Sequence, residues 1–225
     1  MTPARDTDPT EPVVLLTGFE PFDGERVNPS QDVVAALDGE RVAGHRIVGA
    51  VLPVAFAATL PLLDDLLDRH RPLLAIALGQ AGGRSEIGIE RIAINLVDAR
   101  IPDADGLQPV DAAVIDGAPY ACPTQLPAKA ITAHLRALGI PAALSLSAGS
   151  YVCNQVFFAL VHAIGARLPG ARGGFVHLPW LPSQVVSRPG QPSMALATMV
   201  EGVRAAIACA LATPRDLDVH GGATH

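Results

Sequence analysis

The chain has 225 residues, 49% of them hydrophobic and 17% charged, with a formal net charge of −6. This composition excludes a globally disordered chain, and the lack of a Lys/Arg cluster argues against a nucleic-acid or anionic-membrane surface. No apolar run reaches the length that spans a bilayer, and the first dozen residues are polar, unlike a signal peptide. Three cysteines without CxxC spacing favour a reducing compartment, so we expect a cytoplasmic protein.

Strand and helix patterns alternate through the first half of the chain. Continuous or alternating apolar runs predict strands at 13–17, 46–54 and 73–78. A helix is expected to begin with Ser30 as its N-cap, and leucines at helical spacing predict a second helix at 56–69. The loop at 79–84 resembles a phosphate-binding turn, but it lacks the GxGxxG order, so no dinucleotide site is predicted.

The Gly/Pro loop after the first strand carries Phe19 and Phe22. Two phenylalanines on such a loop can pack beneath it, as surface-proximal aromatic residues commonly do. They can also form the apolar wall of a pocket for a small ring. The residues alone leave both interpretations open.

A carboxylate stands inside the alternating apolar run at 87–98, which predicts one strand or a pair of strands. Glu90 in this run either lies on an exposed edge strand or needs a buried partner. The irregular, proline-rich residues 100–127 follow, and long irregular segments within a domain are often functional. A helix is expected at 128–138, closed by Gly139.

A strand at 142–146, a turn of small residues and a helix from Val152 onward form the centre of the sequence. This helix is apolar all round, which is typical of a helix inside a protein. Cys153 lies in its first turn, where unpaired N–H groups and the helix dipole favour a thiolate over a thiol. The alternative is an inert buried cysteine that acts as a small hydrophobe.

Residues 173–178 predict another strand, with Phe175 and His177 on one face. His177 therefore lies near the carboxyl end of a strand, where open α/β sheets place their sites, although most lone strand histidines are structural. A last helix is expected at 194–212, followed by a polar tail. The alternation predicts one α/β domain, its largely parallel sheet covered on both faces.

Five separate segments resemble the pyroglutamyl-peptidase I family, also called pyrrolidone-carboxylate peptidases. In chain order they are TGFEPFDGERVNPS (17–30), GQAGGR (79–84), ERIAINLVDARIPDADG (90–106), SAGSYVCN (147–154) and GGFVHLPWLP (173–182). The resemblance implies a single three-layer α/β/α sandwich with a mixed, largely parallel twisted sheet. The catalytic domain would span 13–212, with flexible tails at 1–12 and 213–225.

The resemblance also implies a cysteine peptidase that removes N-terminal pyroglutamate from peptides through a thioester. Its motifs place a catalytic triad on Glu90, Cys153 and His177. They also suggest a substrate pocket with Arg100 beside the reacting carbonyl, backbone hydrogen bonds near Gln80, and walls made by Phe19, Phe22, Tyr151 and Val152. No metal or cofactor has a role, and members are commonly homotetramers.

The chain departs from the family pattern at a few positions, such as Tyr151 in place of a usual Phe, Ile87–Ile89 in place of Ile-Thr-Pro, and Trp180 in place of Tyr. Two rival functions remain: a glutaminase-type Cys-His-Glu amidotransferase and a non-catalytic pyroglutamyl-binding homologue. The motifs predict no pocket carboxylate, beyond Glu20 and the triad Glu90, placed to pair a charged substrate amine.

Overall fold

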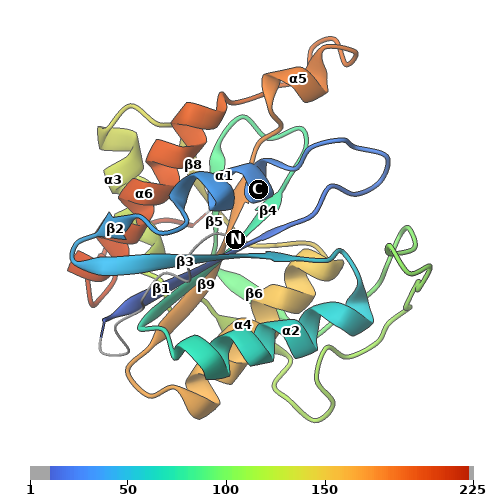
Figure 1. Cartoon of the computed structure of the whole chain (residues 1–225), viewed down its shortest axis with the longest axis horizontal. Coiled ribbons are helices and arrows are strands. Elements are labelled where there is room, and N and C mark those ends of the chain that lie inside the picture. The colour runs from blue at the N-terminus through green and yellow to red at the C-terminus, as the bar shows by residue number, and fades with distance from the viewer. Residues whose placement is uncertain (1–10, 223–225) are drawn as a thin grey trace, which may run out of the picture.

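A seven-stranded sheet lies between two layers of helices in the computed structural model, which describes residues 11–222 (Figure 1). The strands of this sheet, in spatial order, are β2 (Arg41–Val42), β3 (His45–Leu52), β1 (Val13–Phe19), β4 (Leu74–Gln80), β9 (Arg172–Leu178), β5 (Ile87–Glu90) and β8 (Ala142–Ser145). Neighbouring strands run parallel except in the pairs β2–β3 and β5–β9. A separate antiparallel pair joins β6 (Ile92–Ile94) to β7 (Ala121–Pro123).

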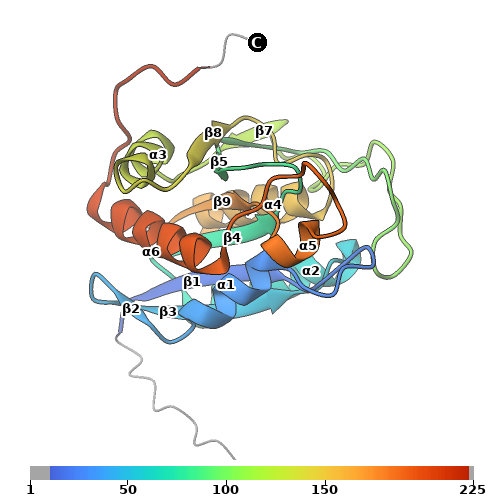
Figure 2. The ribbon, with the colours of Figure 1, turned by 90° about the horizontal axis from the view of Figure 1, so that it is seen from above.

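Helices cover both faces of the sheet, as Figure 2 shows from above. The two layers are formed by α2 (Phe56–His70) and α4 (Val152–Arg167) on one face, and by α1 (Pro29–Leu37), α3 (Ala128–Ala137) and α6 (Leu196–Ala212) on the other. A short α5 (Pro182–Val185) follows β9. None of the described helices is long and apolar enough to cross a membrane.

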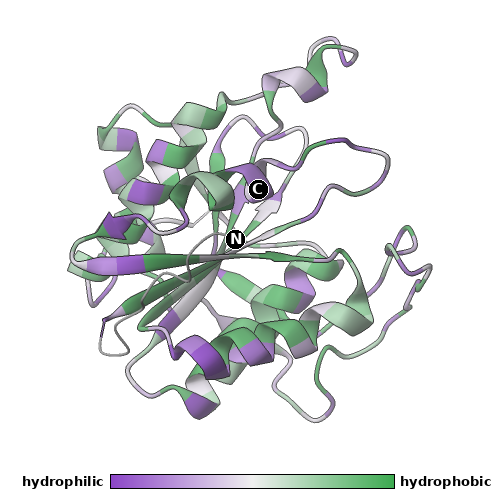
Figure 3. Ribbon diagram, in the orientation of Figure 1, coloured by the Kyte–Doolittle hydropathy of each residue, from purple (hydrophilic) through white to green (hydrophobic). Residues whose placement is uncertain are grey.

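The two-residue period of the strands explains why each face needs its own helical layer. In β4, Leu74, Ile76 and Leu78 pack with α1, α3 and α6, whereas Ala75 and Ala77 face α2 and α4. Because both faces are buried, the central strands are mostly apolar, and Figure 3 shows them largely green between helices that carry both hydrophobic and hydrophilic residues. The predicted α/β/α sandwich is confirmed.

Two helices begin at residues that differ from the prediction. Asn28, not Ser30, caps α1, and its Oδ1 accepts hydrogen bonds from the backbone N–H and hydroxyl of Ser30. The Ser30 hydroxyl instead accepts the N–H of Phe19 at 2.9 Å. The last helix begins at Leu196 rather than Met194, and the N–H of Met194 donates to the carbonyl of Trp180.

The described part of the C-terminal segment packs against α3. The N-cap position of α3 is Pro127, which provides no side-chain cap, and the Asp216 carboxylate accepts the N–H groups of Lys129 and Ala130 at 3.1 and 2.9 Å. The segment passes α3 in Figure 2. Asp216 therefore acts as a long-range cap for orphan N–H groups at a helix start. Of the predicted tails, 1–10 and 223–225 lie outside the described residues.

Replacing Asp216 with Ala should lower the free energy of unfolding by about 1 kcal/mol, the usual cost of losing a helix cap. Urea denaturation followed by circular dichroism measures this difference. Asp218→Ala removes an equal charge from an exposed position two residues away and serves as the control. Equal stability of the two variants would show that Asp216 does not cap α3.

Candidate active site

Strand register brings Glu90 and His177 together on the sheet face that α4 covers. In the antiparallel pair β5–β9, Gly88 lies directly opposite His177, and Glu90 follows on the same face two residues later. Phe175 shares this face, with its ring centroid 4.9 Å from that of His177. The predicted common face of Phe175 and His177 is confirmed, since Val176 and Leu178 point into the opposite core.

Glu90 is fully buried and paired. Its Oε1 lies 2.7 Å from Nδ1 of His177 and 2.9 Å from Nη1 of Arg84. Burial alone would raise the pKa of Glu90, but the hydrogen bond and charge of His177, with the charge of Arg84, bring it below its ordinary value. The carboxylate is therefore ionised, and Glu90 does not lie on a solvent-exposed edge.

Cys153, on α4, lies on the same side of the sheet as the Glu90–His177 pair. The backbone of Gly79 in β4 is the parallel partner of His177, and a Cβ added there would lie 3.0 Å from the Cys153 sulfur and 2.8 Å from the Phe175 ring. Only glycine leaves room for this sulfur beside the strand. The thiol and the imidazole therefore border the same short stretch of backbone.

Burial favours the thiol form of Cys153, whereas its place at the helix start favours the thiolate. Burial, reinforced by the negative charge of Glu90, raises the pKa of Cys153 to about 12. Backbone hydrogen bonding and the charge of Arg84 act in the opposite direction but do not offset the loss of hydration. A nucleophilic Cys153 therefore needs a base that removes its proton, and the nearby imidazole is chemically suited to that role.

The residue after Cys153 fixes the start of α4. Asn154 is fully buried, and its side chain accepts the N–H of Ile94 and donates to the carbonyls of Ile94 and Leu96 at 2.9–3.0 Å. Sequence reasoning had assigned Asn154 no part in the site. Its position next to Cys153 at the first turn of a buried helix was the available signal.

Two further contacts attach the irregular segment after β6 to the turn before α4. The Ser150 hydroxyl donates to the carbonyl of Asp98 at 2.8 Å, and the Tyr151 hydroxyl donates to the carbonyl of Pro102 at 3.0 Å. The hydroxyl that distinguishes Tyr151 from Phe therefore joins two loops. It does not stand free at the cavity wall.

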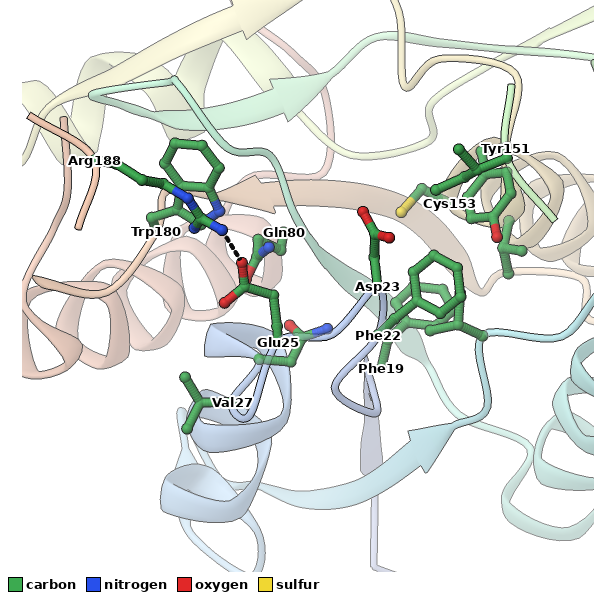
Figure 4. Close-up of a pocket in the computed structure, with 14 residues that line it drawn as sticks. Phe19, Phe22, Asp23, Glu25, Val27, Gln80, Tyr151, Cys153, Trp180 and Arg188 are labelled. Carbon is green, nitrogen blue, oxygen red and sulfur yellow. Dashed lines mark hydrogen bonds and ion pairs between the residues drawn. The ribbon is translucent and has the colours of Figure 1, made fainter. Parts of the chain in front are cut away.

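A cavity of about 300 Å³ opens beside Cys153 (Figure 4). Six of the predicted site residues line it: Phe19, Phe22, Gln80, Tyr151, Val152 and Cys153. The rings of Phe22 and Tyr151 lie 5.7 Å apart. Phe19 serves both of its possible roles, since it is also buried in the core beneath the loop.

The opposite end of the cavity is polar, and most of its residues were not predicted. Arg188 forms an ion pair with Glu25 at 2.5 Å and stacks 4.7 Å over the ring of Trp180. Gln184, just outside the lining, donates to Oε1 of Gln80 at 2.8 Å. Glu25 comes from the loop before α1, whereas Trp180, Gln184 and Arg188 come from the segment that follows β9, so only folding brings them together (Figure 4).

Two results modify the expected pocket. Arg100 is exposed and does not line the cavity, whereas its neighbour Ile101 does. The sequence predicted no carboxylate, beyond Glu20 and Glu90, placed to pair a charged substrate amine, but Asp23 and Glu25 both line the cavity. Glu25 is neutralised by Arg188, which leaves Asp23 as the carboxylate able to meet a charged ligand.

No group of three His, Cys, Asp or Glu side chains suited to a metal gathers within the described residues.

A thiol at a helix start, an imidazole beside it and a buried carboxylate that orients the imidazole form the arrangement of a cysteine hydrolase. Comparison with known proteins then identifies the family. The family model described as Pyroglutamyl peptidase matches residues 13–213, and this chain belongs to that family.

Relatives cover nearly the whole chain. The pyrrolidone-carboxylate peptidase of Cupriavidus taiwanensis is 51% identical over 95% of this chain and 100% of its own length. That of Klebsiella pneumoniae is 52% identical over 94% and 99%. Among solved structures, pyroglutamyl peptidase I of Bacillus amyloliquefaciens matches with a TM-score of 0.90 at 41% identity, covering 93% of this chain and 100% of that one. Pyrrolidone carboxyl peptidase of Thermococcus litoralis matches with 0.91 at 37%, covering 93% and 99%.

Gly79→Ala should leave the chain folded but strongly reduce the reactivity of Cys153. The added methyl group would displace the sulfur or the Phe175 ring, and such overpacking costs about 1–3 kcal/mol of stability. The rate of iodoacetamide labelling of Cys153, read by peptide mass mapping, measures the effect. Gly165→Ala is the matched control, since its Cβ would meet only Gln125 at 3.7 Å. Labelling of Gly79→Ala at the wild-type rate would contradict the proposed lack of space.

Proposed function

We propose that this chain removes N-terminal pyroglutamyl residues from peptides, with Cys153 as nucleophile, His177 as base and acid, and Glu90 as the group that orients the imidazole. The observation that carries the proposal is the fully buried Glu90 carboxylate, which lies 2.7 Å from His177. Both residues lie on the sheet face that α4 covers, and Cys153 belongs to the first turn of α4. Membership of the pyroglutamyl peptidase family supplies the substrate class.

The reaction begins when His177 accepts the thiol proton as the Cys153 sulfur attacks the carbonyl carbon of the pyroglutamyl peptide bond. Backbone N–H groups at the start of α4 are placed to stabilise the negative oxygen that forms. The C–N bond breaks as His177 returns the proton to the leaving amine, and a thioester remains. Water, deprotonated by His177, hydrolyses the thioester and restores the thiol. A role for Arg100 beside the carbonyl stays a prediction.

The cavity suits a flat, uncharged five-membered lactam. Phe19, Phe22 and Tyr151 provide apolar contact for the ring, and the backbone around Gln80 can satisfy its polar atoms. We further propose a cytoplasmic homotetramer, as the family resemblance implies.

Cys153→Ser should abolish turnover of a pyroglutamyl anilide, because a hydroxyl is a much weaker nucleophile in this setting. Cys122→Ser is the matched control and should keep wild-type activity, since Cys122 lies on β7 and not in the cavity. Release of the anilide chromophore is measured beside glutamine hydrolysis. Glutaminase activity without pyroglutamyl turnover would favour the amidotransferase, and binding without either reaction would favour a non-catalytic homologue.

Pyroglutamyl-Ala should be cleaved with kcat/KM at least about 10²-fold above that for Pro-Ala, because a site built around hydrogen bonds rejects the analogue that lacks the ring carbonyl. The prolyl ammonium could still pair with Asp23 at the cavity wall. Asp23→Asn should therefore increase this ratio, with Asp32→Asn on α1 as the control. A ratio below 10² in the wild type would contradict the pocket assignment even if Cys153 is the nucleophile.

A further inference from the structure

The buried Glu90 carboxylate receives two cationic or proton-donating groups on a single oxygen. Nδ1 of His177 and Nη1 of Arg84 both approach Oε1, at 2.7 and 2.9 Å. Among the described residues, Oε2 accepts no hydrogen bond although it is fully buried. A buried carboxylate satisfied on one side only depends strongly on the charge of its partners.

Arg84 reaches Glu90 by a path that the backbone leaves open. Its side chain comes from the loop between β4 and β5, and Nη2 also donates to the carbonyl of Ser147 at 3.4 Å. A Cβ on Gly88 would lie 2.6 Å from Nη1 of Arg84, but 3.5 Å or more from His177 and Glu90. The missing side chain at Gly88 is therefore what lets the guanidinium reach the carboxylate.

Four groups from different elements surround the carboxylate. They are His177 from β9, Ser145 from β8, Cys153 from the start of α4, and Arg84 from the loop before β5. Of these, Arg84 alone carries a permanent positive charge. Its side chain is 37% exposed, so its charge acts through a partly solvated path.

We propose that Arg84 is a positioning residue for the Glu90–His177 pair: its guanidinium offsets part of the carboxylate charge and holds Oε1 toward the imidazole, so that the imidazole is oriented to accept the thiol proton. This inference rests on the proposed function for its meaning in catalysis. The effect of the Arg84 charge on the Glu90–His177 pair depends only on the geometry. In this geometry the role of Gly88 is to leave space for the guanidinium.

Loss of the Arg84 charge should change the pH at which activity begins, and the direction of this change can be derived. Without it, the full carboxylate charge acts on His177 and favours the imidazolium, which cannot accept a proton. The same loss disfavours the Cys153 thiolate, since the Arg84 charge lowers the pKa of that thiol. Both effects move the onset of activity to higher pH. A cation within a few ångströms shifts a pKa by about 1–3 units, and solvent exposure reduces this to roughly half a unit or more.

The test compares Arg84→Met with the wild type in the pH dependence of kcat/KM for a pyroglutamyl anilide. The acid limb should move upward by about half a pH unit or more, since an opposite charge is removed. Arg84→Lys should recover most of the shift because it keeps the charge. Gly88→Ala, which leaves Arg84 in the chain but displaces its guanidinium, should shift the limb in the same direction. Arg69→Met removes a surface cation, paired with Asp65 on α2, and should leave the limb unchanged.

A second measurement separates this inference from the proposed function. The pH dependence of iodoacetamide labelling at Cys153 needs no substrate, and it should shift in the same direction in Arg84→Met. If the wild type does not cleave the anilide but its labelling profile shifts in the variant, the proposed function fails and the positioning role stands. If both profiles of Arg84→Met overlay those of the wild type, with or without a lower rate, Arg84 does not position the pair.

Discussion

The site depends on one constraint: a carboxylate with no contact with solvent must remain ionised. Glu90 satisfies it through His177 and Arg84, which approach the same oxygen from a neighbouring strand and from a loop. Desolvation opposes the charge, and the two partners overcome that opposition. Because the penalty for a misplaced partner is large, the register of β5 against β9 is held by electrostatics as well as by backbone hydrogen bonds.

The same buried environment acts in opposite ways on the two groups that would exchange a proton. It keeps the thiol of Cys153 protonated, and the negative charge of Glu90 adds to that effect. It also makes the oriented imidazole the natural acceptor, since Glu90 stabilises the charged form of His177 once the proton moves. A protected thiol paired with a positioned base is less exposed to adventitious oxidation than a free thiolate would be.

Glycine has specific roles where the chain must leave room for these groups. At Gly79 the missing side chain accommodates the Cys153 sulfur against β4, and at Gly88 it lets Arg84 cross to Glu90. Neither position has a left-handed backbone conformation, so the requirement is close approach and not torsional freedom.

The layers of the fold follow from the sequence alone, because continuous apolar strands and amphipathic helices indicate which surfaces must be buried. The sequence also indicated Cys153, Glu90 and His177 as unusual residues, since reactive or charged groups inside apolar runs require a partner. It could not show the contacts of Arg188 and Asp216, because they join segments far apart in the chain, nor the contact of Arg84, because the loop before β5 must fold back to bring its guanidinium onto Glu90. Nor could it give the pKa of Cys153, since the helix start is visible in the sequence whereas the desolvation that outweighs it arises only when the layers close around the thiol.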